Sequence, residues 1–148
     1  MAKQPINIEF QIKGIDLLSI QLPGIDTKQV EPTEIEFDIT LEQRITPENE
    51  LVVVNCTISA HNLGKEFLLG SIKVGCLYHV KSMDKLLTKD KGSINLPSKF
   101  IETINIVTIG TARGMMFSEF KGTYLHNAIL PLIDPAVLSN VQKHVIEK

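Results

Sequence analysis

Strict alternation of apolar and polar residues marks the first part of the chain. Residues 34–42, EIEFDITLE, change character at every step. One face of this segment carries Ile35, Phe37, Ile39 and Leu41. Residues 6–13, INIEFQIK, alternate in the same way. A period of two is typical of a half-buried β-strand, so both segments are predicted to be strands with one face on a core.

Glycines and turn residues divide the strand-rich part into four strands. Apolar positions change parity after Gly14, which indicates a β-bulge or bend in the first strand. Residues 51–60 and 67–80 are predicted to be two further strands, separated by a turn at 61–64. Consecutive strands with short turns favour an antiparallel sheet whose last three strands form a meander.

The pattern changes to a helical period after residue 97. Pro97 suits the first turn of a helix, and apolar residues then recur at threes and fours over 98–121. Gly110 and Gly114 lie inside this helix. Each costs about 1 kcal/mol relative to alanine. We therefore expect a compensating close approach of another backbone, most simply between subunits.

Residues 121–135, KGTYLHNAILPLIDP, are punctuated like a loop by Gly122, Pro131 and Pro135, yet most of the rest is apolar. Because loops usually lie on the surface, this segment either packs under another element or offers its apolar side chains to a partner. Asp134 and Pro135 form a helix-start signal, so residues 136–146 are predicted to be a last helix. The fold class is therefore α+β: a four-stranded antiparallel sheet, a long helix, an apolar connection and a C-terminal helix.

Composition limits the classes of function. A chain of 148 residues fits a single domain, 1–148, with a substantial core. The net charge of −2 argues against a nucleic-acid partner and against adsorption to anionic lipid. No apolar run approaches the length that spans a membrane, and the polar N-terminus is unlike a signal peptide, so no membrane insertion is expected.

The chemistry-bearing residues do not form a catalytic pattern. Cys56 and Cys76 are expected to lie on opposite faces of neighbouring strands, with Cys56 opposite about Ser71, and so to remain free thiols in a reducing, cytoplasmic compartment. The four histidines show no metal-ligand spacing among themselves or with the cysteines. Nucleotide-binding and nucleophile motifs are absent from the sequence. We expect no enzyme, no catalytic residue, no metal and no cofactor.

Several stretches resemble the SecB export-chaperone family in their order and spacing. The similar stretches are FQIKGI (10–15), PTEIEFDIT (32–40), VGCLYHV (74–80), the Ala112-Arg113 pair of the long helix, and KGTY (121–124) followed by ILPLID (129–134). The resemblance covers about residues 6–140 and is closest to divergent SecB-like proteins. It implies an ATP-independent chaperone, a holdase, that binds unfolded preproteins or other non-native polypeptides in hydrophobic grooves and assembles as a homotetramer, a dimer of dimers.

The resemblance also implies which residues act. The apolar connection would line a groove against the sheet. The client-binding residues would be Ile35, Phe37, Ile39, Tyr124, Leu125, Ile129, Leu130 and Leu132. The subunit interface would include Gly110, Arg113, Gly114 and Phe117. The competing interpretation of the first set is ordinary packing of a half-buried strand and of a loop folded onto its own sheet.

Two departures from the family argue against delivery of clients to its partner, the motor SecA. Ser19 and Gly70 stand where the family carries acidic sheet residues. The last residues, QKHVIEK, follow the expected final helix without a polar tail. An acidic face does exist on residues 34–42, and we interpret it first as a solvated sheet face.

Two other functions remain as alternatives. One is a SecB-like adaptor dedicated to a single partner, such as a labile antitoxin or an envelope precursor. Promiscuity of binding separates it from a general holdase. The other is a small-ligand binding domain or an enzyme, which an enclosed pocket with convergent polar groups would favour.

Overall fold

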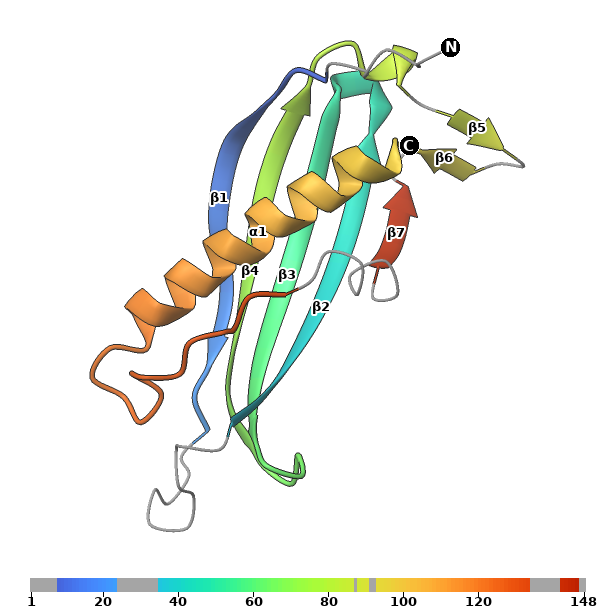
Figure 1. The fold of residues 1–148 in the computed structure, drawn as a ribbon. Helices are drawn as coiled ribbons and strands as arrows, with labels where there is room; N and C mark the ends of the chain where they lie inside the picture. Colours follow the sequence, from blue (N-terminus) through green and yellow to red (C-terminus); the bar gives the residue numbers. More distant parts are fainter. Residues whose placement is uncertain (1–7, 24–34, 87, 91–92, 134–141, 147–148) are drawn as a thin grey trace.

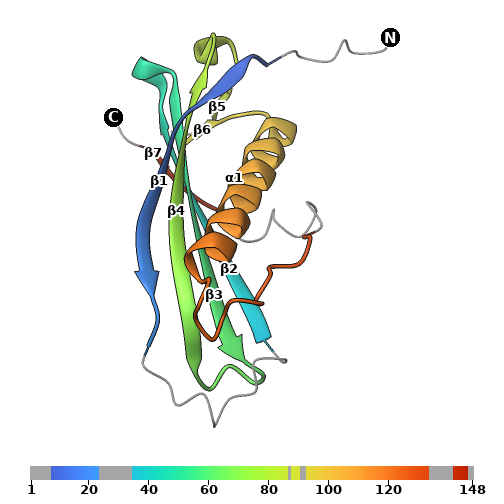
Figure 2. The same ribbon diagram turned by 90° about the vertical axis from the view of Figure 1, so that its left-hand side faces the viewer.

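The computed structural model describes residues 8–23, 35–86, 88–90, 93–133 and 142–146. The elements, in chain order, are β1 (Phe10–Gln21), β2 (Ile35–Thr46), the short 3-10 helix η1 (Pro47–Asn49), β3 (Leu51–Asn62), β4 (Leu68–Val80), the 3-10 helix η2 (Met83–Lys85), β5 (Thr88–Asp90), β6 (Ser93–Asn95), α1 (Ser98–Glu119) and β7 (Gln142–Ile146). One sheet has the order β1-β4-β3-β2-β7, and α1 crosses one of its faces diagonally (Figures 1 and 2). The predicted α+β class, a four-stranded antiparallel sheet followed by a helix, is confirmed.

The meander of β2, β3 and β4 has one strongly buried face, which we call the helix side. Along β3 every second residue is buried: Val52, Val54, Cys56, Ile58 and Ala60. The buried row of β4 includes Tyr78, whose hydroxyl bonds Thr108 of α1 at 2.7 Å, so this row faces the helix. The alternation in the sequence thus translates directly into a layer of apolar side chains between the sheet and α1.

The edge strand β1 contains two register shifts against β4, one between Ile12 and Gly14 and one between Leu17 and Ser19. The first confirms the bulge predicted at Gly14, and the second was not predicted. Each shift reverses the parity of the strand. As a result the apolar residues Ile12, Ile15, Leu17 and Ile20 all pair with the helix-side row of β4.

The two cysteines lie closer together than predicted. Cys56 pairs with Val74, and Cys76 pairs with Val54, so both side chains are on the helix side and are diagonal neighbours. The prediction of opposite faces was wrong because the turn between β3 and β4 extends to Phe67 and the register shifts between Ala60 and His61. Both cysteines are buried and free, as predicted. Burial, with a smaller effect of Cys76, raises the pKa of the Cys56 thiol to about 12.

The helix α1 begins at Ser98, directly after Pro97, and ends at Glu119, close to the predicted range of 98–121. Its inner face buries Phe100, Ile104, Ile109, Ala112 and Met116. A polar pair is buried with them: the Gln43 Nε2 atom donates to the Asn105 Oδ1 atom at 2.6 Å. Both residues are 0% exposed, and Gln43 Oε1 and Asn105 Nδ2 have no partner among the described residues.

The prediction for the C-terminal part was wrong where the structure describes it. Residues Gln142–Ile146 form β7, which pairs in parallel with β2 over Leu41–Ile45, instead of continuing a helix. The helix start predicted at Asp134 and Pro135, and residues 136–141, lie outside the described residues. Local spacing suggested a helix, but the open edge of β2 offers backbone partners to an extended segment. Before the helix, Thr88–Asp90 and Ser93–Asn95 form a short antiparallel pair, β5 and β6.

Candidate functional site

The apolar connection after α1, residues 121–133, forms a strap across the sheet. Turns close at Phe120 and Thr123, where the Thr123 and His126 amides donate to their carbonyls at 3.1 Å. The chain then runs back alongside α1 on the helix side, as the orange-red trace shows in both views (Figures 1 and 2). The strap therefore packs onto its own sheet.

The strap has an inner and an outer face. Leu125, Ala128 and Leu130 point inward and are 1%, 5% and 2% exposed. Ile129 and Leu132 point outward and are 57% and 91% exposed. Of the predicted client-binding residues in this segment, Leu125 and Leu130 are therefore part of the core, whereas Ile129 and Leu132 are on the surface. Client binding by any of them stays a prediction.

Tyr124 and Leu125 fix the first half of the strap to β4. The Tyr124 hydroxyl lies against the carbonyl oxygen of Leu69 and reaches that of Pro23 at 2.9 Å. Desolvation at this contact raises the pKa of Tyr124. The Cδ1 atom of Leu125 fills the space above Gly70. Gly70, which stands where the resemblance expects an acidic sheet residue, lies buried on the helix side, directly against Leu125 of the strap.

Arg113 fixes the second half of the strap. Its Nε atom donates to the Leu130 carbonyl at 2.8 Å, and its Nη2 atom donates to the Pro131 carbonyl at 3.1 Å. The family resemblance implied that Arg113 lies at a subunit interface. Within the chain it joins α1 to the strap, and an interface role stays a prediction.

The other predicted interface residues lie on the outer surface of α1. Apart from the neighbouring backbone of α1 itself, a Cβ atom on Gly114 would meet no atom of the described residues within 4 Å, and one on Gly110 would meet only Arg113, at 3.8 Å. Phe117 is 43% exposed and Ile106 is 45% exposed on the same helix. The described chain therefore offers no close packing that would offset the two glycines, and the subunit contact stays a prediction.

The predicted residues of β2 lie beside the strap. Ile35, Phe37 and Ile39 are half-buried and pack against the core cluster. Phe37 pairs with Ala60, and Ala60 pairs with Gly70, so these residues form one row across three strands. Leu125 contacts the Gly70 end of this row. The structure therefore brings the β2 residues and the strap, 82 or more positions apart, to the same surface.

The acidic stretch of β2 lies on the opposite face, which we call the far side. Asp38 bonds Lys65 at 2.8 Å and lies 3.6 Å from His61. The Asp38 carboxylate, through this bond, raises the pKa of Lys65. Part of the acidic character is thus balanced within the chain, in line with a solvated face.

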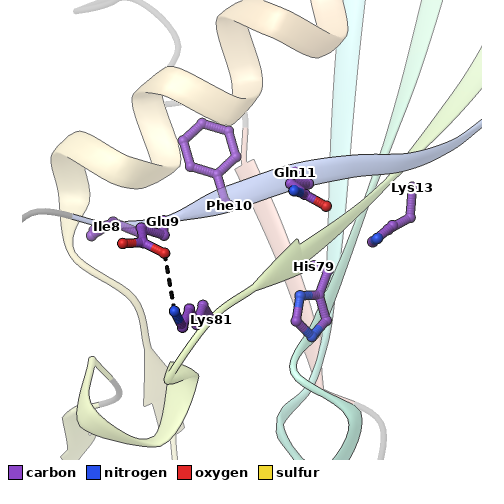
Figure 3. A pocket seen from close by; sticks show the side chains of 7 residues that line it. All are labelled: Ile8, Glu9, Phe10, Gln11, Lys13, His79 and Lys81. Carbon is purple, nitrogen blue, oxygen red and sulfur yellow. Dashed lines mark ion pairs between the residues drawn. The ribbon is translucent and has the colours of Figure 1, made fainter.

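A hollow of about 630 Å³ lies at the β1–β4 edge, and Figure 3 shows the seven side chains that line it. Phe10 points toward α1, whereas His79 and Lys13 lie on the other side of the strand pair. Glu9 and Lys81 form an exposed ion pair at 3.3 Å. An ion pair exposed to water contributes little to stability. The side chains that line the hollow include no nucleophile beside a base, so they do not form a catalytic arrangement.

The described residues contain no group of three or more histidine, cysteine or acidic residues that could hold a metal ion. They also contain no helix that is long and apolar enough to cross a membrane.

No protein-family model matches this chain. A comparison with curated proteins likewise finds no match. Solved structures do match. The Mycobacterium tuberculosis SecB-like chaperone Rv1957, in complex with a ChAD peptide from the Rv1956 HigA1 antitoxin, is 12% identical, with a TM-score of 0.53 over 84% of this chain and 85% of that chain. A Streptococcus agalactiae protein of unknown function is 11% identical, with a TM-score of 0.41 over 87% of this chain and 99% of that chain. The first likeness confirms the fold that the sequence motifs predicted, and the chain has a SecB-like fold.

Proposed function

We propose that this protein is an ATP-independent chaperone that binds non-native polypeptides on the helix side of its sheet. The observation that carries the proposal is the apolar surface on this side of a SecB-like fold. β1 contributes Ile12, Ile15, Leu17 and Ile20, which are 37–49% exposed. The strap adds Ile129 and Leu132, which are 57% and 91% exposed.

Such a surface suits weak binding of many sequences. Large exposed apolar patches mark sites of protein interaction. Burial at about 25 cal/mol per Å² favours any apolar segment, so the surface selects for unfolded chains and not for one sequence. The half-buried residues Ile35, Phe37 and Ile39 extend the apolar surface along β2.

The proposal includes assembly, location and clients. We propose that the protein assembles as a homotetramer, a dimer of dimers, and that the outer surface of α1 forms a subunit contact. This surface carries Ile106, Gly110, Gly114 and Phe117, which have little packed against them in the described chain. We place the activity in the cytoplasm, since two unpaired buried cysteines suit a reducing compartment. Preproteins bound for export are the proposed clients. The protein acts without catalysis. Delivery to SecA is not part of the proposal, because Ser19 and Gly70 stand where the family carries acidic sheet residues.

A second function, an adaptor dedicated to one partner, rests on a specific observation. The SecB-like chaperone Rv1957 has been solved with a peptide from an antitoxin. A single labile protein, such as an antitoxin or an envelope precursor, would then be the partner of this chain.

The deciding experiment measures mass by light scattering. The purified protein is measured alone and after addition of several unrelated, denaturant-unfolded, slowly folding proteins. A particle near four chains that takes up each client without nucleotide supports the general holdase. A particle that ignores all of them contradicts it and leaves the dedicated adaptor.

A further inference from the structure

We propose that the strap is a built-in competitor for client: its residues Tyr124–Leu130 occupy the deep part of the binding surface and leave it when a client segment arrives. This inference rests on the proposed function and extends it. The strap then does not line a groove, as the family resemblance implied, but fills it. The client segment that fits presents two large apolar side chains on one face with a small one between them, as Leu125, Ala128 and Leu130 do.

The surface under the strap has the shape of a trough. Ala60 and Gly70 are paired neighbours on β3 and β4, and Phe37 continues the row on β2. Two small residues beside larger ones leave a depression in the sheet. Leu125 fills it so closely that its Cδ1 atom lies 2.5 Å from where a Cβ atom on Gly70 would be. The trough therefore takes one branched aliphatic side chain, from the strap or from a client.

The strap is held by side chains and not by a backbone ladder. The last backbone bond within the described strap is from the Ala128 amide to the Leu125 carbonyl, at 2.9 Å. Beyond it, the Leu130 and Pro131 carbonyls accept from the Arg113 side chain. A segment of this kind opens locally at lower cost than a strand of the sheet, because few backbone bonds must break.

The outward residues explain how exchange begins. Ile129 and Leu132 already face solvent and flank the inward Leu130 in the sequence. A client that contacts them lies on the strap itself. When a client displaces Leu125 and Leu130, its apolar contacts with the sheet replace those of the strap. Binding is then favourable because the client buries more apolar surface than the strap did.

A disulfide staple between positions 70 and 125 tests the proposal. Since the added Cβ on Gly70 would lie 2.5 Å from Leu125 Cδ1, the two Cβ atoms are at most about 5 Å apart, near the separation that a disulfide needs. The variant Gly70→Cys/Leu125→Cys is measured oxidised and reduced with a reduced, alkylated small protein that cannot refold. The native cysteines stay in place because their burial keeps them unreactive.

We expect the oxidised staple to bind this client at least about tenfold more weakly than the reduced form of the same protein. The single variants Gly70→Cys and Leu125→Cys should show no effect of oxidation. Equal affinity of the two forms overturns the strap inference while leaving the proposed function intact. If neither the reduced staple nor the wild type takes up client, the proposed function fails, and the inference falls with it.

A second variant tests the same inference by weakening the attachment of the strap. Tyr124→Phe removes the hydroxyl that bonds Leu69 and Pro23 but keeps the ring. We expect client uptake to become about two- to tenfold faster, because the closed state is weakened. Unchanged or slower uptake, with the circular dichroism spectrum of the wild type, overturns the inference.

Discussion

The Cδ1 atom of Leu125 lies 2.5 Å from the point that a Cβ atom on Gly70 would occupy. The strap therefore rests on a residue without a side chain. The same Cβ atom would lie 3.2 Å from the backbone oxygen of Gln21, which has little freedom to move. A single buried glycine thus sets how closely residues 121–133 approach β4.

Gly70→Ala should destabilise the protein by about 1–3 kcal/mol, because overpacking displaces Leu125 and strains the contact with Gln21. Urea unfolding followed by circular dichroism measures the change. The matched control is Gly14→Ala, whose added Cβ would sit at an ordinary 3.7 Å from Leu77. Equal stability of Gly70→Ala and wild type would show that the strap does not press on Gly70.

Leu132→Asp should weaken client binding by about three- to tenfold, because the substitution removes an apolar contact and places a charge on the surface that binds the client. Stability should remain within about 0.5 kcal/mol of wild type, because the side chain is 91% exposed. Fluorescence anisotropy with a labelled unfolded client measures the affinity. Asn127→Asp, an exposed strap position that gains the same charge, is the control. If both variants bind equally well, Leu132 is no client contact.

Gly114→Leu should shift the assembly toward smaller species, because the outer surface of α1 is the proposed subunit contact. The folded chain itself should accept the change, since a Cβ atom there meets no atom of the described residues within 4 Å apart from the neighbouring backbone of α1. Analytical ultracentrifugation over a concentration series measures the shift. An unchanged mass removes Gly114 from the interface.

Gln43 and Asn105 should be strongly coupled. Replacing either one alone by leucine leaves the other amide buried and unpaired, at a cost of about 1–3 kcal/mol. The double variant should recover part of this loss, because both polar groups are then gone. A double-mutant cycle from urea unfolding gives the coupling energy. Additive losses would contradict the direct bond at 2.6 Å.

Stability should fall as pH rises above about 9. Burial raises the pKa of Cys56 from 9.0 to about 12, so the folded state holds this proton more tightly than the unfolded state. The contribution is complete below pH 9 and is lost as pH approaches 12. Between pH 9 and 10.5 we expect a loss of about 1–2 kcal/mol in urea unfolding.

The control for this pH dependence is Cys56→Ala. This variant should be less stable than wild type at every pH, but its free energy of unfolding should decrease less than that of wild type as pH rises. Part of the fall should persist, because burial also raises the pKa of Tyr78. A wild-type stability that is flat from pH 8 to about 10.5 would contradict the assignment of a protonated buried thiol.

The sequence predicted those features that depend on local periodicity. The alternation in β2, the bulge at Gly14 and the extent of α1 follow from neighbours a few residues apart. The C-terminal strand β7 was missed because its strand character depends on the edge of β2, about 100 positions away. Tertiary pairing of this kind overrides a weak helical pattern.

The sequence did not predict how the side chains of the apolar connection are oriented. Composition showed that residues 121–135 are too apolar for an ordinary loop. It did not show that Leu125 and Leu130 face inward while Ile129 and Leu132 face outward. That depends on Tyr124 meeting the carbonyls of Leu69 and Pro23, and on Arg113 meeting those of Leu130 and Pro131. Long-range bonds to backbone atoms leave little signal in a single sequence.

The anchoring of Tyr124 gives the protein an optical signal of its own. The chain has no tryptophan and only two tyrosines. Tyr78 is enclosed between the sheet and α1, where its hydroxyl bonds Thr108 at 2.7 Å, and Tyr124 sits at the start of the strap. In the variant Tyr78→Phe, all tyrosine emission therefore comes from the strap. Stopped-flow emission of that unlabelled variant, mixed with a client that lacks aromatic residues, would follow the strap in real time.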